Sequence, residues 1–350
     1  MSENFDFIVV GGGSAGAVVA SRLSEDPSFR VALIEAGERP PEVSLMPVAP
    51  AAMQLNPATD WMYTADPGKA GLGLNGRRVP VPRGKMLGGS SSLNYMMYVR
   101  GHPGDFDSWA AGGATGWSYA EVLPYFRKSE GLAPSADIPI DAPAHNSAGP
   151  LGVSARAPAL QGANEFVEAA VAAGIPRGDY NGRERGGVAG AVSLTQYTIR
   201  QGKRSSTYYA FLEGEPERRP NLTIITGAQA TRVILEGEAG QLTATGVEYR
   251  TGTGEILIAH AGKDDFERRR DRLASFIAAV RYRAAAGTGR SWCSLPTGSA
   301  ACRQAFERPP GGAIVLSRAG GRCVDERGRA LGGTRGSPRT WGTAARRSRR

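Results

Sequence analysis

The stretch FDFIVVGGGSAG, residues 5–16, decides the fold of this chain. Its first six residues form a short apolar run, which predicts a buried strand of a parallel sheet. A cluster of glycines follows directly, and residues 17–23 are helix-like. A second apolar strand, residues 30–34, ends at the acidic Glu35. Strand, glycine turn, helix, strand and acid in this order predict an α/β fold with a Rossmann-like βαβ unit.

Gly11, Gly13 and Gly16 supply the pattern G-x-G-x-x-G, and Ser14 lies in the same turn. In this pattern the first glycine makes a tight turn, the second lets a pyrophosphate approach the backbone, and the third lets helix and strand pack closely. The helix N-terminus offers free N–H groups to the phosphates. Glu35 lies 24 positions after Gly11, where its carboxylate can accept hydrogen bonds from ribose hydroxyls. We predict that these five residues bind a dinucleotide, either NAD or FAD; a turn without a ligand is the alternative.

A second glycine-rich stretch, PRGKMLGGSSSLNYMMYVRG, occupies residues 82–101. Its Gly-Gly-Ser-Ser-Ser loop offers backbone amides and hydroxyls to a polar ligand, and Asn94 adds an amide that can donate and accept. This stretch resembles the first signature of the glucose-methanol-choline (GMC) oxidoreductases. The resemblance implies that the dinucleotide is FAD and that Ser90, Asn94, Tyr95 and Met97 contact it.

The resemblance also implies the chemistry. Members of the family oxidise an alcohol, CH–OH to C=O: a histidine takes the hydroxyl proton and a hydride passes to the flavin. Oxygen or a quinone-linked acceptor then reoxidises the flavin. Some members attach FAD covalently through a histidine just before the signature asparagine, but this chain has Leu93 there, which has no nucleophilic atom. We therefore expect non-covalent FAD and a small-molecule alcohol as substrate.

The likeness to the family continues almost without a break to about residue 262. The further segments that carry it are residues 101–130, 179–182, 198–212, 221–235, 246–249 and 255–259. In the family, the backbone at the position of Ala230 touches the adenine. The resemblance implies a Rossmann-like FAD-binding domain with a parallel sheet, built from residues 1–155 and 218–262. It also implies a partial α+β substrate domain from residues 156–217, which later sequence would complete.

The charge is distributed unevenly along the chain. The formal net charge of the chain is +9. Residues 264–350 carry 19 Arg, no Lys and 7 acids, a net charge of +12, so residues 1–263 have a net charge of −3. All three cysteines, Cys293, Cys302 and Cys323, also lie after residue 263, in a spacing that fits neither a disulfide framework nor a metal site. The chain changes character near residue 263, and we treat residues 263–350 as an Arg-rich divergent tail.

The genetic code suggests an origin for this tail. Where the family continues with Ser-Ala-Gly-Ala-Ile-x-Ser-Pro, this chain has ERRRDRLAS at residues 267–275. Synonymous codons for that segment, when they are read from the second nucleotide, spell Ser-Ala-Gly-Ala-Ile-Ala-Ser-Pro. In the same shifted frame residues 275–279 can encode five leucines, and residues 280–284 can encode the family's Ser-Gly-Ile-Gly-Pro. We infer a one-nucleotide frameshift, in the gene or its sequencing, near residue 264, and we expect a poorly ordered tail.

No residue of this chain is assigned a catalytic role, and no metal site is expected. His102, His145 and His260 are interpreted as structural or surface residues, because the family's catalytic histidine lies far downstream. The alternative function is a binding protein without FAD, whose basic tail contacts nucleic acid or acidic surfaces. The tail lacks interleaved aromatic residues and a recognisable motif, so we expect no nucleic-acid partner. The sequence has no apolar run of membrane-spanning length, and we expect a cytoplasmic protein.

Overall fold

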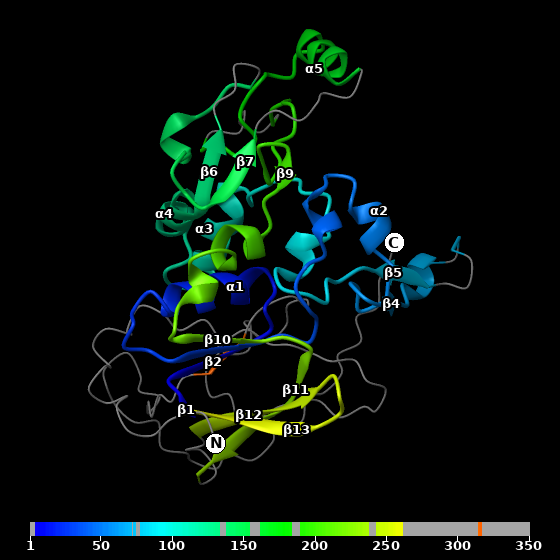
Figure 1. Cartoon of the computed structure of the whole chain (residues 1–350). Helices are drawn as coiled ribbons and strands as arrows, with labels where there is room; N and C mark the ends of the chain where they lie inside the picture. The colour runs from blue at the N-terminus through cyan, green and yellow to red at the C-terminus, as the bar shows by residue number, and fades with distance from the viewer. Residues whose placement is uncertain are drawn as a thin grey trace, which may run out of the picture.

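The computed structural model describes residues 4–71, 73–74, 78–133, 138–154, 162–183, 190–237, 243–261 and 314–316. Two four-stranded sheets lie at one end of the molecule, and short helices and two-stranded sheets form the other end (Figure 1). In the described ranges no helix is both long enough and apolar enough to cross a membrane. The mixed α/β character predicted from the sequence is confirmed.

The first sheet contains the predicted βαβ unit. Strands β2 (Phe7–Val10), β3 (Val31–Ile34) and β10 (Leu222–Ile225) are parallel, in the order β10-β3-β2. Helix α1 (Ser14–Leu23) connects β2 to β3, and every residue of these two strands is buried. Strands covered on both faces need apolar residues at every position, which explains the unbroken apolar runs. The short strand β14 (Ile314–Leu316) pairs antiparallel with β2 and is the part of the tail that the structure describes.

The prediction of a single strand over residues 5–10 is wrong at Asp6. The structure divides this segment into β1 (Asn4–Phe5), which pairs with the second sheet, and β2, which lies in the first. Asp6 donates its backbone N–H to the Arg30 carbonyl at 2.8 Å, and its carboxylate accepts the Arg30 N–H at 2.7 Å. These two hydrogen bonds to the next strand fix Asp6 between the sheets, so the chain passes from one sheet to the other there.

The second sheet has the order β1-β13-β12-β11. Strands β11 (Ala228–Glu236), β12 (Thr243–Thr251) and β13 (Ile256–Ala261) are antiparallel, and β12 and β13 form the closing hairpin expected from the sequence. The pairing of β11 with β12 shifts register between Ala230 and Arg232. A buried cluster that includes Ile8, Ala32 and Val247 joins the two sheets face to face.

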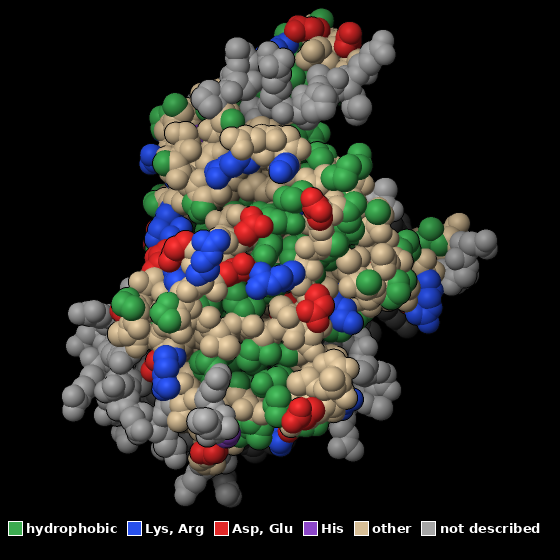
Figure 2. Space-filling view, viewed as in Figure 1, with side chains coloured by type: hydrophobic (Ala, Val, Ile, Leu, Met, Phe, Trp, Pro, Cys, Tyr) green, Lys and Arg blue, Asp and Glu red, His purple; other side chains and the backbone are tan. Residues whose placement is uncertain are grey.

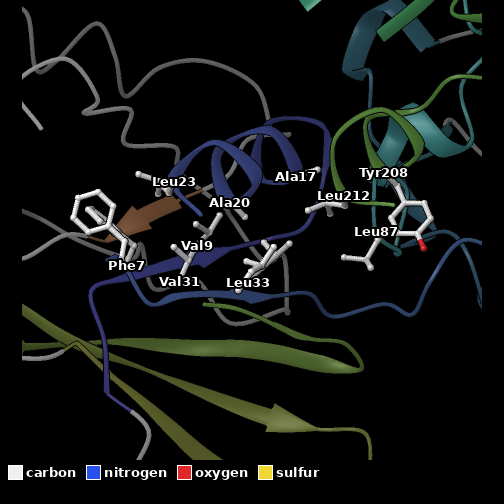
Figure 3. Packing of buried hydrophobic residues seen from close by; sticks show 12 residues of the cluster. Phe7, Val9, Ala17, Ala20, Leu23, Val31, Leu33, Leu87, Tyr208 and Leu212 are labelled. Atoms are coloured by element: carbon white, nitrogen blue, oxygen red, sulfur yellow. The ribbon is translucent and has the colours of Figure 1, made fainter. Parts of the chain in front are cut away.

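The other face of the parallel sheet packs against α1. Figure 3 shows Ala17, Ala20 and Leu23 of the helix directed toward the side chains of the strands. Tyr208 and Leu212, from a short π-helical turn (Tyr208–Leu212), complete this cluster. The range predicted as substrate domain, residues 156–217, therefore contributes Tyr208, Tyr209 and Leu212 to the cluster on this face of the parallel sheet.

The remaining elements lie toward the other end of the molecule. The helices are α2 (Pro50–Met53), α3 (Pro103–Ala111), α4 (Tyr119–Ser129) and α5 (Ala163–Ala172). The strands are β4 (Tyr63–Ala65) with β5 (Val79–Val81), β6 (Glu130–Ala133) with β7 (Leu151–Ser154), and β8 (Ile199–Arg200) with β9 (Lys203–Arg204). The pair β6 and β7 is parallel, whereas the other two pairs are antiparallel.

Candidate cofactor site

The two glycine-rich loops contact each other directly. The backbone N–H of Gly88 donates to the carbonyl of Gly12 at 2.7 Å. A Cβ atom on Gly89 would lie 2.7 Å from the Cα of Gly13, and Gly89 has a positive φ of 52°. Gly89 cannot carry a side chain without movement of the backbone, so glycine is required at this position for the two loops to approach this closely. The motifs at residues 11–16 and 82–101 thus form one site.

The N-terminus of α1 is open to an acceptor. Gly13 is the N-cap, no side chain caps the helix, and its first turn contains no acidic residue. A Cβ on Gly13 would meet only the Gly89 Cα, at 3.9 Å, and Gly11 (φ +89°) has no neighbour within 4 Å of its Cβ position. Gly16 is buried within α1, whereas the Ser14 hydroxyl is 3.5 Å from the Gly88 carbonyl. The free N–H groups of the first helical turn can therefore bind an anion.

Glu35 joins the same site from the end of β3. Its carboxylate accepts the N–H of Gly12 at 2.7 Å and that of Gly37 at 2.9 Å, and the residue is 5% exposed. Burial raises the pKa of Glu35 to about 7, although these amide hydrogen bonds act in the opposite direction. The sequence assigned Glu35 to ribose hydroxyls; the structure shows that its oxygens also hold the glycine loop in place.

The buried carboxyl of Glu35 makes the stability of the chain depend on pH. Its pKa in the folded state lies above the value of 4.5 for the unfolded chain, so folding favours the neutral form. We expect the free energy of unfolding to fall by roughly 3 kcal/mol as the pH rises from about 4.5 to 7. Urea unfolding at several pH values measures this slope. Glu35→Gln, which cannot ionise, should flatten it, and equal slopes for the two proteins would contradict the assignment.

Residues 90–97 present polar and apolar groups side by side. Ser90 accepts the N–H of Gly84 at 3.1 Å, and the Asn94 side-chain oxygen accepts the N–H of Met96 at 3.0 Å. Met96 is 4% exposed, whereas Tyr95 and Met97 on either side of it are 63% and 62% exposed. Met96 has a positive φ of 62°, so the backbone turns at this residue, and the side chains before and after it both lie on the surface. These side chains are free to contact a flat aromatic ligand.

Ala230 is connected to this site through the start of its strand. It is a half-buried residue of β11, two positions after Ala228, whose N–H donates to the Glu35 carbonyl at 2.9 Å. The structure therefore brings the glycine loops, Glu35 and the start of β11 together, and Ala230 packs against the buried cluster between the two sheets.

Sequence reasoning missed Arg204 and the neighbourhood of His145. Arg204 is buried beneath the Ser90–Asn94 loop and donates to Asn94, while His145 lies between two buried carboxylates. The sequence contained one signal for each: a basic residue in the family-like segment 198–212, and a histidine in a Pro/Ala/Asp-rich loop. Neither signal identifies a partner that is distant in sequence.

The histidines have contacts that agree with structural roles. The His102 ring accepts the N–H of Gly104 at 3.1 Å and caps α3, and His260 lies in β13 opposite Gly246. His145 is buried and bonded to Glu130 and Asp179. In the described ranges no group of three or more His, Cys, Asp and Glu residues could hold a metal ion.

Charges of both signs are mixed over the face shown in Figure 2, where Lys and Arg side chains lie among Asp and Glu side chains. Ion pairs among the described residues include Arg183 with Asp141 at 3.0 Å and Arg219 with Glu215 at 2.8 Å. The Arg-rich tail lies outside the described residues, apart from β14, and so does the expectation that it is poorly ordered.

The amino-acid sequence is similar to a family model and to curated proteins of that family. Residues 5–265 match the family model described as GMC oxidoreductase. The chain is 39% identical over 270 residues to an uncharacterized GMC-type oxidoreductase of Mycobacterium bovis, covering 75% of this chain and 47% of the relative. It is 40% identical over 272 residues to the oxygen-dependent choline dehydrogenase of Pseudomonas entomophila, covering 75% and 45%. The chain thus spans about half the length of the curated relatives it matches.

Solved structures of two oxidases have a similar fold. The fold resembles pyridoxine 4-oxidase from Mesorbium loti with a TM-score of 0.63 and 36% identity, over 73% of this chain and 47% of that one. It resembles formate oxidase with a TM-score of 0.63 and 29% identity, over 75% and 45%.

Proposed function

The chain belongs to the GMC oxidoreductase family, and we propose that it is the FAD-binding part of an enzyme that oxidises a small alcohol. Residues 5–265 match the N-terminal domain of the family, which is the FAD-binding domain of GMC oxidoreductases. The observation that carries the proposal is the direct contact between the Gly11–Gly13 turn and the Gly88–Gly89 loop, next to an uncapped helix N-terminus. This arrangement joins a dinucleotide-binding turn to the loop expected at the flavin.

The residues present fit FAD on three independent features. The uncapped N-terminus of α1 suits a pyrophosphate, because its amides have no acceptor within the helix. Tyr95 and Met97 offer exposed apolar surface to a flavin ring. Arg204 carries a buried Nη2 group with no hydrogen-bond partner. Together these features favour a large anionic ligand with an aromatic ring.

We assign a role to each part of the site. The α1 amides and Gly13 bind the phosphates, and Glu35 accepts hydrogen bonds from the ribose while it holds the glycine turn. Ser90 and Asn94 orient the flavin by hydrogen bonds, and Tyr95 and Met97 cover its ring. Bound FAD supplies the redox chemistry, because it accepts the hydride that leaves the alcohol carbon. The electron acceptor that follows is oxygen or a quinone-linked carrier.

We further propose that this chain, with its divergent tail, lacks the catalytic base. The family match ends at residue 265, next to residue 264, after which synonymous codons for the tail can be chosen that spell family sequence in a shifted frame. The base and the remaining walls of the substrate pocket would then be encoded in the shifted frame. The protein binds FAD under this proposal but oxidises alcohols slowly.

Flavin titration tests the proposal. Purified chain should bind FAD and quench its fluorescence, whereas NAD should not compete. The bound flavin should pass into the supernatant when the protein is precipitated with acid, because Leu93 offers no attachment atom and is 2% exposed, packed against Ala49, Met53 and Met86. Binding of NAD without FAD would refute the proposed cofactor. Flavin that remains in the pellet would refute the non-covalent assignment alone.

A further inference from the structure

Arg204 is a fully buried cation beside the flavin loop. Its side chain is 2% exposed and ranks among the largest that are completely enclosed. Nε donates to the Ser44 carbonyl at 2.7 Å. Nη1 donates to the Ser91 carbonyl at 3.2 Å, and to the carbonyl and side-chain oxygen of Asn94 at 2.8 and 2.9 Å. One guanidinium thus connects the segment around Ser44 with both ends of the Ser91–Asn94 loop.

No acidic side chain among the described residues balances this charge. The described residues provide no carboxylate within ion-pair distance of Arg204, and its Nη2 group is buried without a hydrogen-bond partner. Arg100, by contrast, is buried against the carboxylate of Glu130 at 2.9 Å. Burial lowers the pKa of Arg204 to about 10, so the group remains charged at neutral pH.

Such a group is costly in a folded chain. A buried charge without a counter-charge, and a buried donor without an acceptor, both oppose folding. Native structures leave few such groups, and those that persist cluster at functional sites. The uncompensated charge of Arg204 lies directly behind Ser91 and Asn94. An anionic ligand bound to that loop would interact favourably with this charge.

The backbone around Arg204 reinforces the same contact. Three residues later, the N–H of Thr207 donates to the Ser91 hydroxyl at 3.0 Å, and the two hydroxyls lie 3.1 Å apart. The π-helical turn that begins at Tyr208 follows directly, and π-type turns are frequent at functional sites. The segment from Arg204 to Tyr208 therefore forms the back of the flavin loop.

We propose that Arg204 is a positioning residue for FAD: its forked guanidinium fixes the Ser91–Asn94 loop, and its unbalanced positive charge strengthens binding of the anionic cofactor. The inference rests on the proposed function, since it concerns the same site. A lysine keeps the charge but cannot reach acceptors on both segments with a planar fork. A glutamine keeps hydrogen-bonding groups but removes the charge. The two substitutions therefore separate geometry from charge.

The experiment measures FAD affinity of the full chain by fluorescence titration in wild type, Arg204→Gln, Arg204→Lys and the control Lys203→Met. Lys203 is the exposed neighbouring cation in β9. We expect Arg204→Gln to bind FAD about ten- to a hundredfold more weakly, which is the loss of charge-assisted hydrogen bonds. Arg204→Lys should lie between that variant and wild type, and Lys203→Met should match wild type.

The midpoint potential of bound FAD supplies a second readout that a purely structural role would not move. Reduction adds negative charge to the flavin, so loss of a nearby buried cation should make the potential more negative in Arg204→Gln, but not in Arg204→Lys. Equal FAD affinity of Arg204→Gln and Lys203→Met would overturn the inference. Equal losses of FAD affinity in Arg204→Gln and Arg204→Lys, with unchanged midpoint potentials, would overturn it too. If Arg204→Gln does not fold, Arg204→Lys with wild-type affinity overturns it. A wild-type chain that binds no FAD refutes the proposed function as well.

Discussion

Restoring the reading frame near codon 264 should raise the rate of alcohol oxidation at least 10²–10⁴-fold over the chain as written, about the contribution of a general base. The increase should exceed that factor, because the restored sequence also supplies pocket walls. Both proteins are assayed on one panel of alcohols, choline and pyridoxine included, with an artificial electron acceptor. These two alcohols are chosen because relatives of the chain are named for them.

FAD content is the necessary control for this comparison. Rates are normalised to bound flavin, so that weak cofactor binding in one protein is not mistaken for a missing base. A restored version in which the catalytic histidine is replaced provides a second control and should fall toward the rate of the chain as written. Comparable turnover by the chain as written and the restored chain would disprove both the frameshift interpretation and the proposed loss of the base.

The βαβ unit could be predicted because its determinants are local. The apolar runs of β2 and β3, the glycines between them and Glu35 all lie within residues 5–35. The division of the first strand at Asp6 could not be predicted, since it depends on hydrogen bonds to Arg30 across the sheet. An apolar pattern shows that residues are buried but not in which sheet they lie. Phe5 and strand β2 are both buried, but they belong to different sheets.

The two glycine loops of the candidate site could be predicted from the sequence, but the contacts that join them to each other and to Arg204 could not. Both glycine loops were identified from sequence, yet the contact of Gly88 with Gly12 joins residues 76 positions apart. Arg204 lies more than a hundred positions from Asn94 and matches no motif that indicates its partners. Spacing rules work within a turn or a strand, whereas these contacts depend on how distant segments pack. The domain boundaries, the assigned cofactor residues and the origin of the tail remain predictions.

The second prediction with a large effect concerns a buried ionic cluster, which we define as Arg100, Glu130, His145 and Asp179. Glu130 has no exposed surface; its carboxylate lies 2.9 Å from Arg100 Nη2 and 2.9 Å from His145 Nδ1. His145 Nε2 lies 2.8 Å from Asp179. With His145 protonated, the cluster holds two cations and two anions. Burial alone would lower the pKa of His145, but the two carboxylates raise it to about 9, so the histidine is charged at neutral pH.

Glu130→Ala should lower the free energy of unfolding by about 3–5 kcal/mol, because it leaves two buried cations with one carboxylate. Urea unfolding followed by circular dichroism measures the loss. The control is Glu168→Ala, which removes an exposed ion pair with Arg177 and should cost under about 1 kcal/mol. Similar losses for the two variants would show that the cluster adds no more than a surface pair.

The pH dependence identifies the charge state on which this prediction rests. The pKa of His145 in the folded protein exceeds its value of 6.5 in the unfolded chain, so protonated His145 stabilises the fold. That contribution is complete below pH 6.5 and is lost as the pH rises through about 9. Glu130→Ala removes one of the two carboxylates that hold the proton, so the loss between pH 7 and 10 should be smaller in the variant. A wild-type chain with constant stability over that interval would mean that His145 is neutral and that Glu130→Ala takes the carboxylate away from only one cation, Arg100.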